Sequence, residues 1–331
     1  MSSAIRAYLL RFLALLVVVT LINFLLPRLL PGSPLRPGGG EIVAAYLPKA
    51  AGEALARTYY LDRPLGEQFA LYLRGLLRGD LGWSVASHRP VAALIAERLP
   101  WTLFLVGTAV LVSGLIGGGL GTASAWWPRR RWARFSMPVV IGLGALPEFL
   151  VAMMLIIAFS VAVQAFPASG AFTPFASAGN NLQGLVGFIG DVLWHATLPA
   201  LTLIAGLVPA FFLLTRNALV IVLGEAYLLT ARGKGLPEGR VMWHAWRNAL
   251  PPVVTLLGLR LAFAVTGAAV TERIFSYPGI GLLLFEAVRG RDYPVMQGVF
   301  LVASLAILSM NFLLDLATVM LDPRARRPRS A

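Results

Sequence analysis

Apolar runs long enough to cross a membrane alternate with polar connectors along this 331-residue chain. A transmembrane helix needs about 20 mostly apolar residues to cross a hydrocarbon core of roughly 30 Å. Runs that approach or exceed this length lie at residues 8–30, 99–127, 137–163, 197–222, 252–271 and 295–321. The pattern predicts an all-α integral membrane protein with six transmembrane helices.

The segment between the first two runs contains two amphipathic stripes. The first predicts a surface helix at the membrane interface. Its apolar members are Leu65, Phe69, Tyr72, Leu73, Leu76 and Leu77. The second stripe, made of Val91, Leu94, Ile95 and Leu99, leads into the second run. It fits an elbow helix and, equally well, an ordinary packed loop helix.

Composition agrees with a lipid environment. Hydrophobic residues make up 58% of the chain and charged residues only 13%, whereas a soluble domain is about a quarter charged. Cysteine is absent, and the three histidines are far apart in the sequence. A disulfide framework is therefore excluded, and no metal site is predicted.

The basic residues predict the topology, because short loops rich in Lys and Arg stay in the cytoplasm. Clusters follow the second run (Arg129, Arg130, Arg131, Arg134), the fourth (Arg232, Lys234, Arg240, Arg247) and the sixth (Arg324, Arg326, Arg327, Arg329). With six spans, these clusters share one side with Arg6 and Arg11. We therefore expect both termini in the cytoplasm. Cations placed between apolar runs, rather than along one polar face, also argue against nucleic-acid binding.

This topology predicts four parts of the chain. Residues 1–31 form the first transmembrane helix, which no small-x-small cleavage site follows, so we expect it to be retained rather than removed as a signal peptide. Residues 32–97 form an extracytoplasmic segment with amphipathic helices. Residues 98–321 form a core of five helices, with a cytoplasmic loop at about 223–251. Residues 322–331 form a basic cytoplasmic tail.

The chain lacks the motifs of an ATPase or a hydrolase. The phosphate-binding pattern G-x-x-x-x-G-K-[ST] does not occur, because the Gly-Lys pair at 233–234 is followed by Gly235. Neither a nucleophile elbow nor a His-Glu-x-x-His motif is present in the sequence. We therefore expect no enzyme activity, and an ATP-driven motor has to be a separate protein.

The connector at 225–251 is long, basic and interrupted by glycine and proline. Residues 225–232 suit a helix that ends at a turn over residues 233–235. Pro237 and Glu238 suit the first turn of a second helix, since proline lacks the N–H donor that this turn leaves unbonded. The sequence predicts a cytoplasmic helix–turn–helix.

This connector resembles the coupling loop of binding-protein-dependent ABC importer permeases of the dipeptide, oligopeptide and nickel branch. The matching stretches are Thr-Ala-Arg-Gly-Lys-Gly-Leu at 230–236 and His-Ala-Trp-Arg-Asn-Ala-Leu-Pro at 244–251. Further branch patterns occur in order at 30–34, 77–82, 89–91, 97–100, 292–298 and 322–324. An extracytoplasmic pattern of the branch is matched by Glu272, Phe275, Pro278, Gly279 and Gly281.

The resemblance implies a type-1 importer permease fold and a non-catalytic subunit that forms half of a translocation pathway for di- or oligopeptides. The chain looks like the first permease of such a system. Its implied partners are a second homologous permease, two ABC ATPases that bind ATP and Mg²⁺, and an extracytoplasmic substrate-binding protein. No cofactor is implied in this chain itself. Nickel or another small solute is the alternative cargo.

The resemblance also implies which residues couple to the ATPase. They are Glu225, Thr230, Ala231, Arg232, Lys234, Gly235, Leu236, Arg240, His244, Asn248 and Pro251. Leu229 stands where the wider superfamily has Glu, and the spacing from Gly235 to Leu250 is longer, as in this branch. Glu225 lies one turn earlier, where an acid can simply stabilise a helix start. The basic residues taken singly have a simpler explanation, which is that they enforce topology.

Ionisable residues inside predicted spans are functional candidates, because hydrocarbon penalises a charge by at least about 2.5–3.5 kcal/mol. Arg216 and Asn217 lie in the fourth run, and Asn311 and Asp315 share one face of the sixth. The second pair fits packing hydrogen bonds better than substrate contact.

Glu148 in the third run and Arg260 in the fifth are uncharged polar positions in similar permeases. The two either line a path for zwitterionic peptides or form a mutual buried pair.

Two rival functions remain open from the residues alone. A secondary transporter or channel would have the same hydropathy, but it would not need the basic connector at 225–251. A membrane-bound enzyme would need a clustered reactive set, which the sequence does not suggest.

Overall fold

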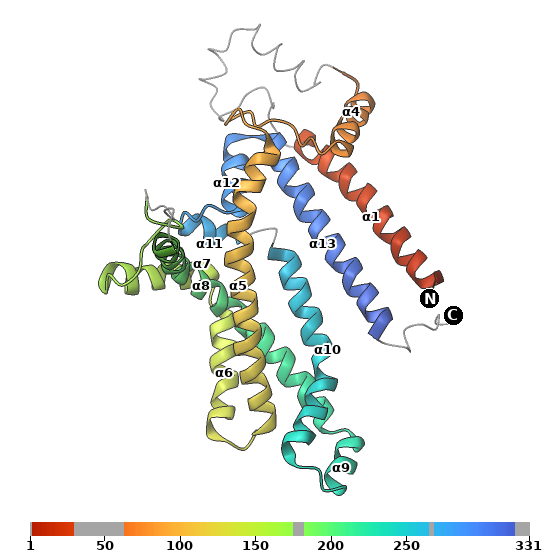
Figure 1. Cartoon of the computed structure of the whole chain (residues 1–331), viewed down its shortest axis with the longest axis vertical. Helices are drawn as coiled ribbons and strands as arrows, with labels where there is room; N and C mark the ends of the chain where they lie inside the picture. Colours follow the sequence, from red (N-terminus) through yellow and green to blue (C-terminus); the bar gives the residue numbers. More distant parts are fainter. Residues whose placement is uncertain (1, 30–62, 175–181, 265–267, 322–331) are drawn as a thin grey trace. The chain divides into compact units, whose positions relative to one another are not determined.

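A computed structural model describes residues 2–29, 63–174, 182–264 and 268–321. Apart from one isolated β-bridge between Trp83 and Pro90, its regular structure is helical. In chain order (Figure 1) the helices are α1 (Ser2–Leu29), α4 (Leu65–Leu77), α5 (Val91–Trp126), α6 (Arg131–Ala145), α7 (Glu148–Leu155), the π-helix η1 (Ile156–Ala162), α8 (Leu182–Leu223), α9 (Ala226–Gly233), α10 (Glu238–Ala264), α11 (Ala269–Ile274), α12 (Ile280–Gly290) and α13 (Tyr293–Leu321). The motifs at 30–34 and 322–324 and the basic tail lie outside the described residues.

Four stretches of described helix are long and apolar enough to cross a membrane: Tyr8–Leu25, Val91–Trp126, Gly184–Leu223 and Tyr293–Leu313. The α6 and α7–η1 pair makes a fifth if the two are counted as one bent span. The span predicted at 252–271 falls on the end of α10, on residues outside the described part, and on the start of α11. It is not among these candidates, so a count of six helices stays a prediction.

The third predicted span, at 137–163, is not one straight helix. α6 ends at Ala145, and helical structure resumes at Glu148 with a change of direction of 95°. Leu146 and Pro147 between them are extended, with ψ angles of 127° and 137°. The ring of Pro147 disfavours a helical conformation at the residue before it, and this accounts for the end of α6.

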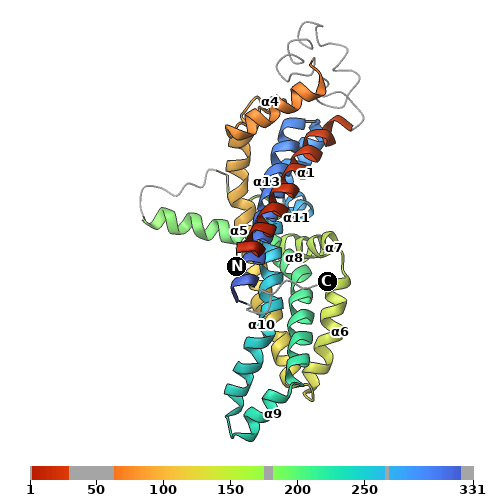
Figure 2. The same ribbon diagram turned by 90° about the vertical axis from the view of Figure 1, so that its right-hand side faces the viewer.

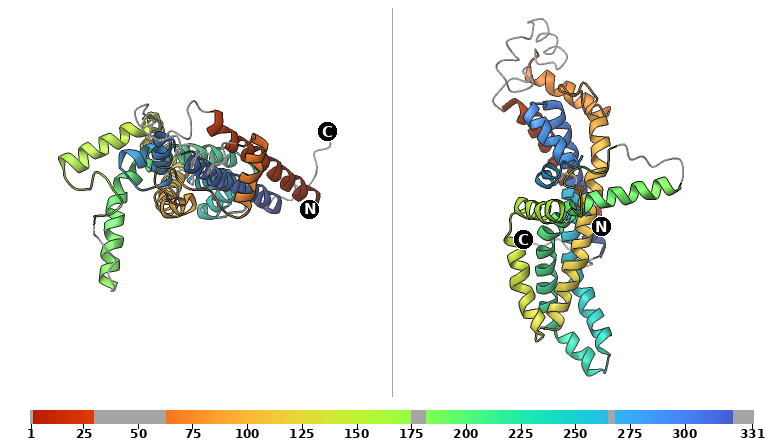
Figure 3. Two further views of the ribbon diagram at one scale, coloured as in Figure 1. Left: turned by 90° about the horizontal axis from the view of Figure 1, so that it is seen from above. Right: turned by 90° about the vertical axis from the view of Figure 1, so that its left-hand side faces the viewer.

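Two helices are longer than the hydropathy pattern predicts. α5 joins the second amphipathic stripe and the second span into one helix of 36 residues. α8 begins at Leu182, inside the stretch at 164–196 that we expected to be a connector. Figures 2 and 3 show the first turns of α8, in bright green, at a steep angle to the rest of the helix. α8 contains Pro199 and Pro209, and a proline inside a helix removes a hydrogen bond and commonly causes a kink.

The chain divides into two compact units: residues 1–101, 265–269 and 279–331, and residues 102–264 and 270–278. In the first unit, α1 and α13 lie side by side and antiparallel (Figure 1). The Asn23 amide of α1 donates to the Gln297 carbonyl (2.9 Å) and to the Tyr72 hydroxyl (3.1 Å). The ring of Phe24 packs against Phe69 with centroids 5.1 Å apart. α4 is thereby attached to α1.

A second contact region of the first unit gathers the start of α5 with α12 and α13. Its buried members are Val91, Leu94, Ile95, Ile280, Leu283, Ala287, Tyr293, Val295, Met296 and Val299. The buried carboxylate of Asp292 accepts hydrogen bonds from the Ser84 hydroxyl (2.5 Å) and the Ala86 N–H (3.1 Å). Asp292 therefore anchors the loop before α5 to the start of α13.

In the second unit, α8 packs against α6, α7 and α10. The backbones of α5 and α8 approach closely at two glycines one turn apart. A Cβ atom added to Gly117 would lie 2.6 Å from the Val208 carbonyl oxygen, and one added to Gly121 would lie 2.6 Å from the Phe212 carbonyl oxygen. Only glycine fits at these positions, as is common where membrane helices pack tightly.

Candidate functional site

The connector at 225–251 folds as a helical hairpin, which confirms the predicted helix–turn–helix. α9 ends at Gly233, and Gly235 adopts a φ of +75° between the two helices. Glycine reaches this left-handed conformation easily, whereas other residues do not. Pro237 immediately precedes Glu238, the first residue of α10.

An apolar cluster holds the hairpin against the ends of α5 and α8. Leu228 of α9 and Val241 of α10 are fully buried beside Leu219 of α8. Ala125 of α5 and Ala245 of α10 complete the contact. Burying one leucine or valine completely is worth about 1.5–3 kcal/mol. α9 is therefore packed as part of the second unit rather than loosely tethered to it.

Polar contacts orient the two arms of the hairpin. The Arg232 Nε donates to the Glu238 carboxylate (3.2 Å), and the Arg232 guanidinium lies 5.8 Å from the ring centroid of Trp126. Asn248 donates from its amide to the Tyr227 hydroxyl (2.6 Å). Exposed ion pairs contribute at most about 1 kcal/mol, so Arg232 and Glu238 set geometry more than stability.

Several predicted coupling residues have structural contacts within the hairpin. Ala231 and Leu236 are partly buried and pack on the apolar cluster. The Thr230 hydroxyl donates to the Ala226 carbonyl of its own helix (3.2 Å). Pro251 lies inside α10. Glu225 precedes α9, but its side chain makes no capping hydrogen bond.

The outer surface of the hairpin combines cations with exposed apolar side chains. Lys234, Arg240 and His244 are exposed, as a docking role requires. Two further residues of this surface, Trp243 and Leu229, are not among the predicted coupling residues. Their side chains are 58% and 65% exposed. Exposed apolar groups of this kind mark interaction surfaces when they cluster.

A sequence signal for the aromatic part of this surface did exist. Trp243 and Trp246 are three residues apart in a basic stretch, and their rings stack at a centroid distance of 5.8 Å. Tyr227 on α9 is also exposed.

The two candidate pathway residues do not contact each other. Glu148, the first residue of α7, accepts a hydrogen bond from the Thr271 hydroxyl of α11. Arg260 is exposed on α10, and the described residues include no ion pair between Arg260 and Glu148. The structure therefore shows Thr271, and not Arg260, as the partner of Glu148.

The other polar residues of the predicted spans have varied surroundings. Arg216 of α8 is partly buried, and its Nε has no hydrogen-bond partner among the described residues. Asn217 and Asn311 are exposed. The side chain of Asp315 lies outside the described part of the chain, so its predicted packing role stays a prediction.

Glu272, which belongs to the predicted extracytoplasmic motif, is completely buried in the second unit. Its carboxylate accepts a hydrogen bond from the Thr102 hydroxyl (2.8 Å). Phe275 and Tyr277 are also completely buried. Burial, together with the nearby Glu272 carboxylate, raises the pKa of the Tyr277 phenol, which therefore stays neutral.

The rest of the motif belongs to the helix that follows. Gly279 is the N-cap residue of α12, and Gly281 is buried in the first turn of that helix. Pro278 directly precedes the cap. The predicted extracytoplasmic motif therefore extends from α11, which contains Glu272, to the first turn of α12.

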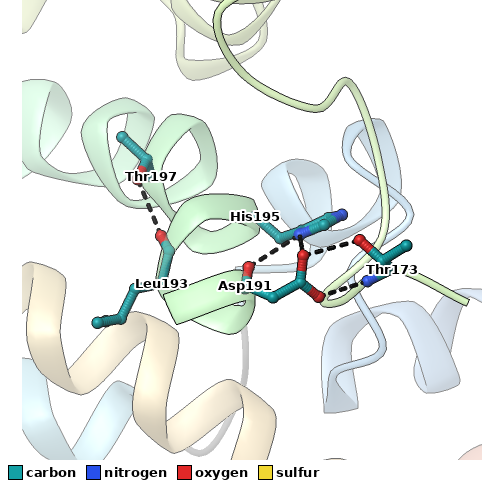
Figure 4. Close-up of polar contacts among 5 residues, drawn as sticks. All are labelled: Thr173, Asp191, Leu193, His195 and Thr197. Carbon is teal, nitrogen blue, oxygen red and sulfur yellow. Dashed lines mark hydrogen bonds and ion pairs between the residues drawn. The ribbon is translucent and has the colours of Figure 1, made fainter. Parts of the chain in front are cut away.

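In the loop before α8, Gly170 and Thr173 are both hydrogen-bonded to residues of other segments. Figure 4 shows the Asp191 carboxylate of α8 accepting hydrogen bonds from the Thr173 N–H (2.6 Å) and the Thr173 hydroxyl (2.7 Å). The Nδ1 atom of His195 lies 2.9 Å from the Asp191 carbonyl oxygen. The Gly170 N–H donates to the Phe275 carbonyl (2.8 Å). Within the described part of the chain, no group of three or more His, Asp or Glu side chains is placed to bind a metal ion.

Comparisons with known proteins identify the family. A family model described as "Binding-protein-dependent transport system inner membrane component" matches residues 116–327. The "Glutathione transport system permease protein GsiC" of Escherichia coli strain K12 is 36% identical over 313 residues, which cover 94% of each chain. The proteins of the same name from Shigella dysenteriae serotype 1 and Salmonella paratyphi A match with the same identity and coverage.

Membership of this family implies a separate ATPase and a substrate-binding protein as partners, and a place in the inner membrane. The chain therefore belongs to the binding-protein-dependent transport system inner membrane components, as a non-catalytic permease subunit of an ABC importer.

Proposed function

We propose that the α9–α10 hairpin is the surface on which the ATPase of this importer docks. The observation that carries this proposal is that Leu228 and Val241 are buried against α5 and α8 while Leu229, Arg240 and Trp243 remain exposed. A partner that binds the exposed side of the hairpin therefore binds an element whose other side is packed against α5 and α8, so the hairpin and these helices are expected to move together.

Transport then follows from rigid-body motion. α9 lies between α8 and α10 in the chain, so a displacement of the hairpin is delivered directly to both helices. Movements of this kind shift packed helices between discrete arrangements rather than deforming them continuously. We infer that ATP binding and hydrolysis in the partner alternate this permease between outward-open and inward-open states.

We propose that both termini and the hairpin face the cytoplasm. The support is the positive charge of the loops after α5 and α8, which lie on one side if six spans are present. On this topology residues 1–31 supply the first span, 32–97 lie outside, 98–321 form the core and 322–331 form a cytoplasmic tail. The start of α5, the loop before α8 and the motif at 272–281 then lie toward the outside.

We propose a complex with a second homologous permease, two ATPase subunits and one external binding protein that delivers the solute to the outer mouth. ATP and Mg²⁺ are bound by the ATPases, and this chain binds neither. In this proposal one permease supplies only half of the pathway, and the exposure of Arg260 leaves it accessible to the other half.

The proposed cargo is a small peptide. The relatives are named for glutathione, itself a short peptide, and this supports a peptide-like solute over nickel. We place Glu148 and Arg260 along the pathway, where an acid and a base suit the charged ends of a zwitterionic peptide. We keep the predicted packing role for Asn311 and Asp315, and because Asn311 is exposed in this chain, its packing partner would have to be another subunit.

The docking proposal is tested in the assembled importer. Replacing Trp243 and Arg240 by alanine removes an exposed aromatic and an exposed cation from the hairpin surface without touching its buried cluster. We expect at least about a tenfold loss of ATPase retention on purification, because interface tryptophans and arginines carry a large share of binding energy.

Trp132→Ala is the matched control, since Trp132 is 42% exposed at the start of α6, outside the hairpin. Equal ATPase retention by the wild type and the double variant contradicts the docking surface. A second experiment separates the importer from an ion-driven carrier: proteoliposomes with the whole complex should take up peptide only with ATP. Uptake by this chain alone under an ion gradient would contradict the proposal.

A further inference from the structure

An apolar cavity of about 570 Å³ lies between α1, α4 and α13 in the first unit. Its wall is formed by aliphatic side chains from all three helices, among them Val17 of α1, Leu73 of α4 and Leu305 of α13. The volume falls within the roughly 300–1,000 Å³ that is common for small-molecule sites. The lining favours a hydrocarbon ligand, because it offers almost no polar group.

The cavity is open along an edge that is itself apolar. Leu77, at the end of α4, contributes to the wall and is 90% exposed. Val17 also contributes to the wall and is 65% exposed. In water, such an edge would be unfavourable. The edge lies beside α1, a candidate membrane span with exposed apolar side chains, where lipid acyl chains would provide an apolar environment.

Two cations stand beside this edge. Arg74 of α4 and Arg78, the residue that directly follows α4, are four positions apart, both are exposed, and neither forms an ion pair with any described residue. Arg78 lies between Leu77 and Gly79, which both line the cavity. At the other end of α4 the exposed Arg63 is neutralised by Glu67 at 2.5 Å. Positive charge is therefore concentrated at the end of α4 next to the cavity, where the nearby carboxylate of Asp80 accepts a hydrogen bond from the Gly82 N–H (2.8 Å).

We propose that this cavity binds one acyl chain of an anionic phospholipid whose phosphate group contacts Arg74 and Arg78. An amphipathic helix that lies at a membrane interface has this arrangement, with an apolar face toward the acyl region and arginines at the level of the headgroups. A transmembrane helix of another subunit would fill the apolar wall but would leave the two arginines without an anion. The charge complementarity therefore favours a lipid.

Assignment of this lipid to the outer leaflet rests on the proposed topology, but the site itself does not. α4 is attached to α1 through Phe69 and Tyr72. A lipid chain held between α4, α1 and α13 adds a third contact to this attachment. We infer that the bound lipid stabilises the position of α4 on the first span.

The test uses the assembled importer, purified from micelles that contain equal amounts of phosphatidylglycerol and phosphatidylethanolamine, with retained lipids counted by native mass spectrometry. Val17→Trp places an indole in the cavity. Val18→Trp is the matched control, because Val18 is the next residue of the same helix, is also exposed and does not line the cavity. We expect Val17→Trp to lose the retained phosphatidylglycerol and Val18→Trp to keep it.

The arginines are tested separately. Arg74→Gln and Arg78→Gln should each lower the preference for phosphatidylglycerol over phosphatidylethanolamine about fivefold, as expected for one cation near a lipid phosphate. Arg63→Gln, the matched change at the other end of α4, should leave the preference unchanged. Equal lipid retention by Val17→Trp and Val18→Trp would overturn the site and indicate only non-specific boundary lipid.

A helix of a neighbouring subunit is the other outcome that would overturn the proposal. The chain has no native cysteine, so Val17→Cys provides a unique position for cross-linking. Cross-linking from residue 17 to the second permease would show that protein covers the cavity. ATP-driven uptake is measured on the same samples: a complex that transports peptide but retains no phosphatidylglycerol overturns the lipid site and leaves the proposed function intact.

Discussion

Gly235 holds a left-handed backbone between α9 and α10, and next to it the Leu236 N–H bonds to the Ala231 carbonyl (3.3 Å). At the scale of single residues, this one conformation sets the angle between the two arms of the hairpin. A different kind of residue-scale contact occurs elsewhere in the second unit, where the buried Glu272 carboxylate accepts a hydrogen bond from the Thr102 hydroxyl (2.8 Å).

Gly235→Ala should destabilise the hairpin by about 1–2 kcal/mol, because an L-residue is strained in the left-handed region. Gly233→Ala is the control, since Gly233 has no positive φ and open space around its Cβ position. The measurement is ATPase retention together with the melting temperature of the complex. Lower values for Gly235→Ala alone support the turn as a requirement for coupling, and equal values for both variants contradict it.

Thr102→Val should lower the free energy of unfolding by about 1–3 kcal/mol, because it removes a donor from a buried carboxylate. Thr108→Val is the matched change in the same helix, where the exposed hydroxyl bonds only to carbonyls of its own turn. We expect it to change stability by less than about 0.5 kcal/mol. Denaturation of the purified complex distinguishes the two, and indistinguishable stabilities would show that the Thr102 contact is dispensable.

At the scale of helices, the backbones of α5 and α8 approach each other closely at two glycines of α5. Gly117 and Gly121 lie one turn apart on the face of α5 that meets α8, whereas Gly119 on the same helix has open space around its Cβ position. Backbone contact of this kind leaves no room for a side chain, so the fit depends on the absence of a Cβ atom.

Gly117→Val should destabilise the second unit by about 1–3 kcal/mol or more, as overpacking does in a dense interior. Gly119→Val adds the same atoms to the same helix and should have little effect. The melting temperature of the complex in detergent is the measurement. A drop for Gly119→Val as large as that for Gly117→Val would mean that helix propensity, and not the contact with α8, is responsible.

At the scale of the whole molecule, the described residues show no ion pair between Glu148 and Arg260, the two charged residues that we propose for the transport pathway. Glu148 accepts a hydrogen bond from Thr271 across 123 positions of sequence, and Arg260 is exposed. The proposed pathway therefore requires the assembled complex.

Glu148→Gln keeps an oxygen that accepts from Thr271 but removes the negative charge, so it tests the charge alone. We expect uptake of zwitterionic peptides by the reconstituted importer to fall by about tenfold, equivalent to the loss of one favourable charge contact. Thr271→Val, which removes the hydrogen bond and keeps the charge, should reduce uptake less. Unchanged uptake of every peptide by Glu148→Gln, with Arg260 intact, removes Glu148 from the pathway.

The hairpin and the helical class were predictable because both depend on local features. Glycine at 233 and 235, followed by Pro237, marks the end of one helix and the start of the next wherever it occurs. The break between α6 and α7 also had a local signal in Pro147, but average hydropathy over 137–163 hides it. The early start of α8 was harder to predict, because glycines at 184, 187 and 190 lower the intrinsic helix propensity.

The amino-acid sequence was sufficient to establish a helical membrane protein, the hairpin and the permease family, since hydropathy, stop signals and the order of motifs are properties of neighbouring residues. Packing alone revealed which distant side chains meet, such as Ser84 with Asp292, 208 residues apart, and Glu148 with Thr271 instead of Arg260. The cavity beside α4 likewise exists only where α1, α4 and α13 come together. The physical reason is that periodicity orients each helix face toward protein or lipid, whereas the pairing of faces depends on the joint fit of all the helices.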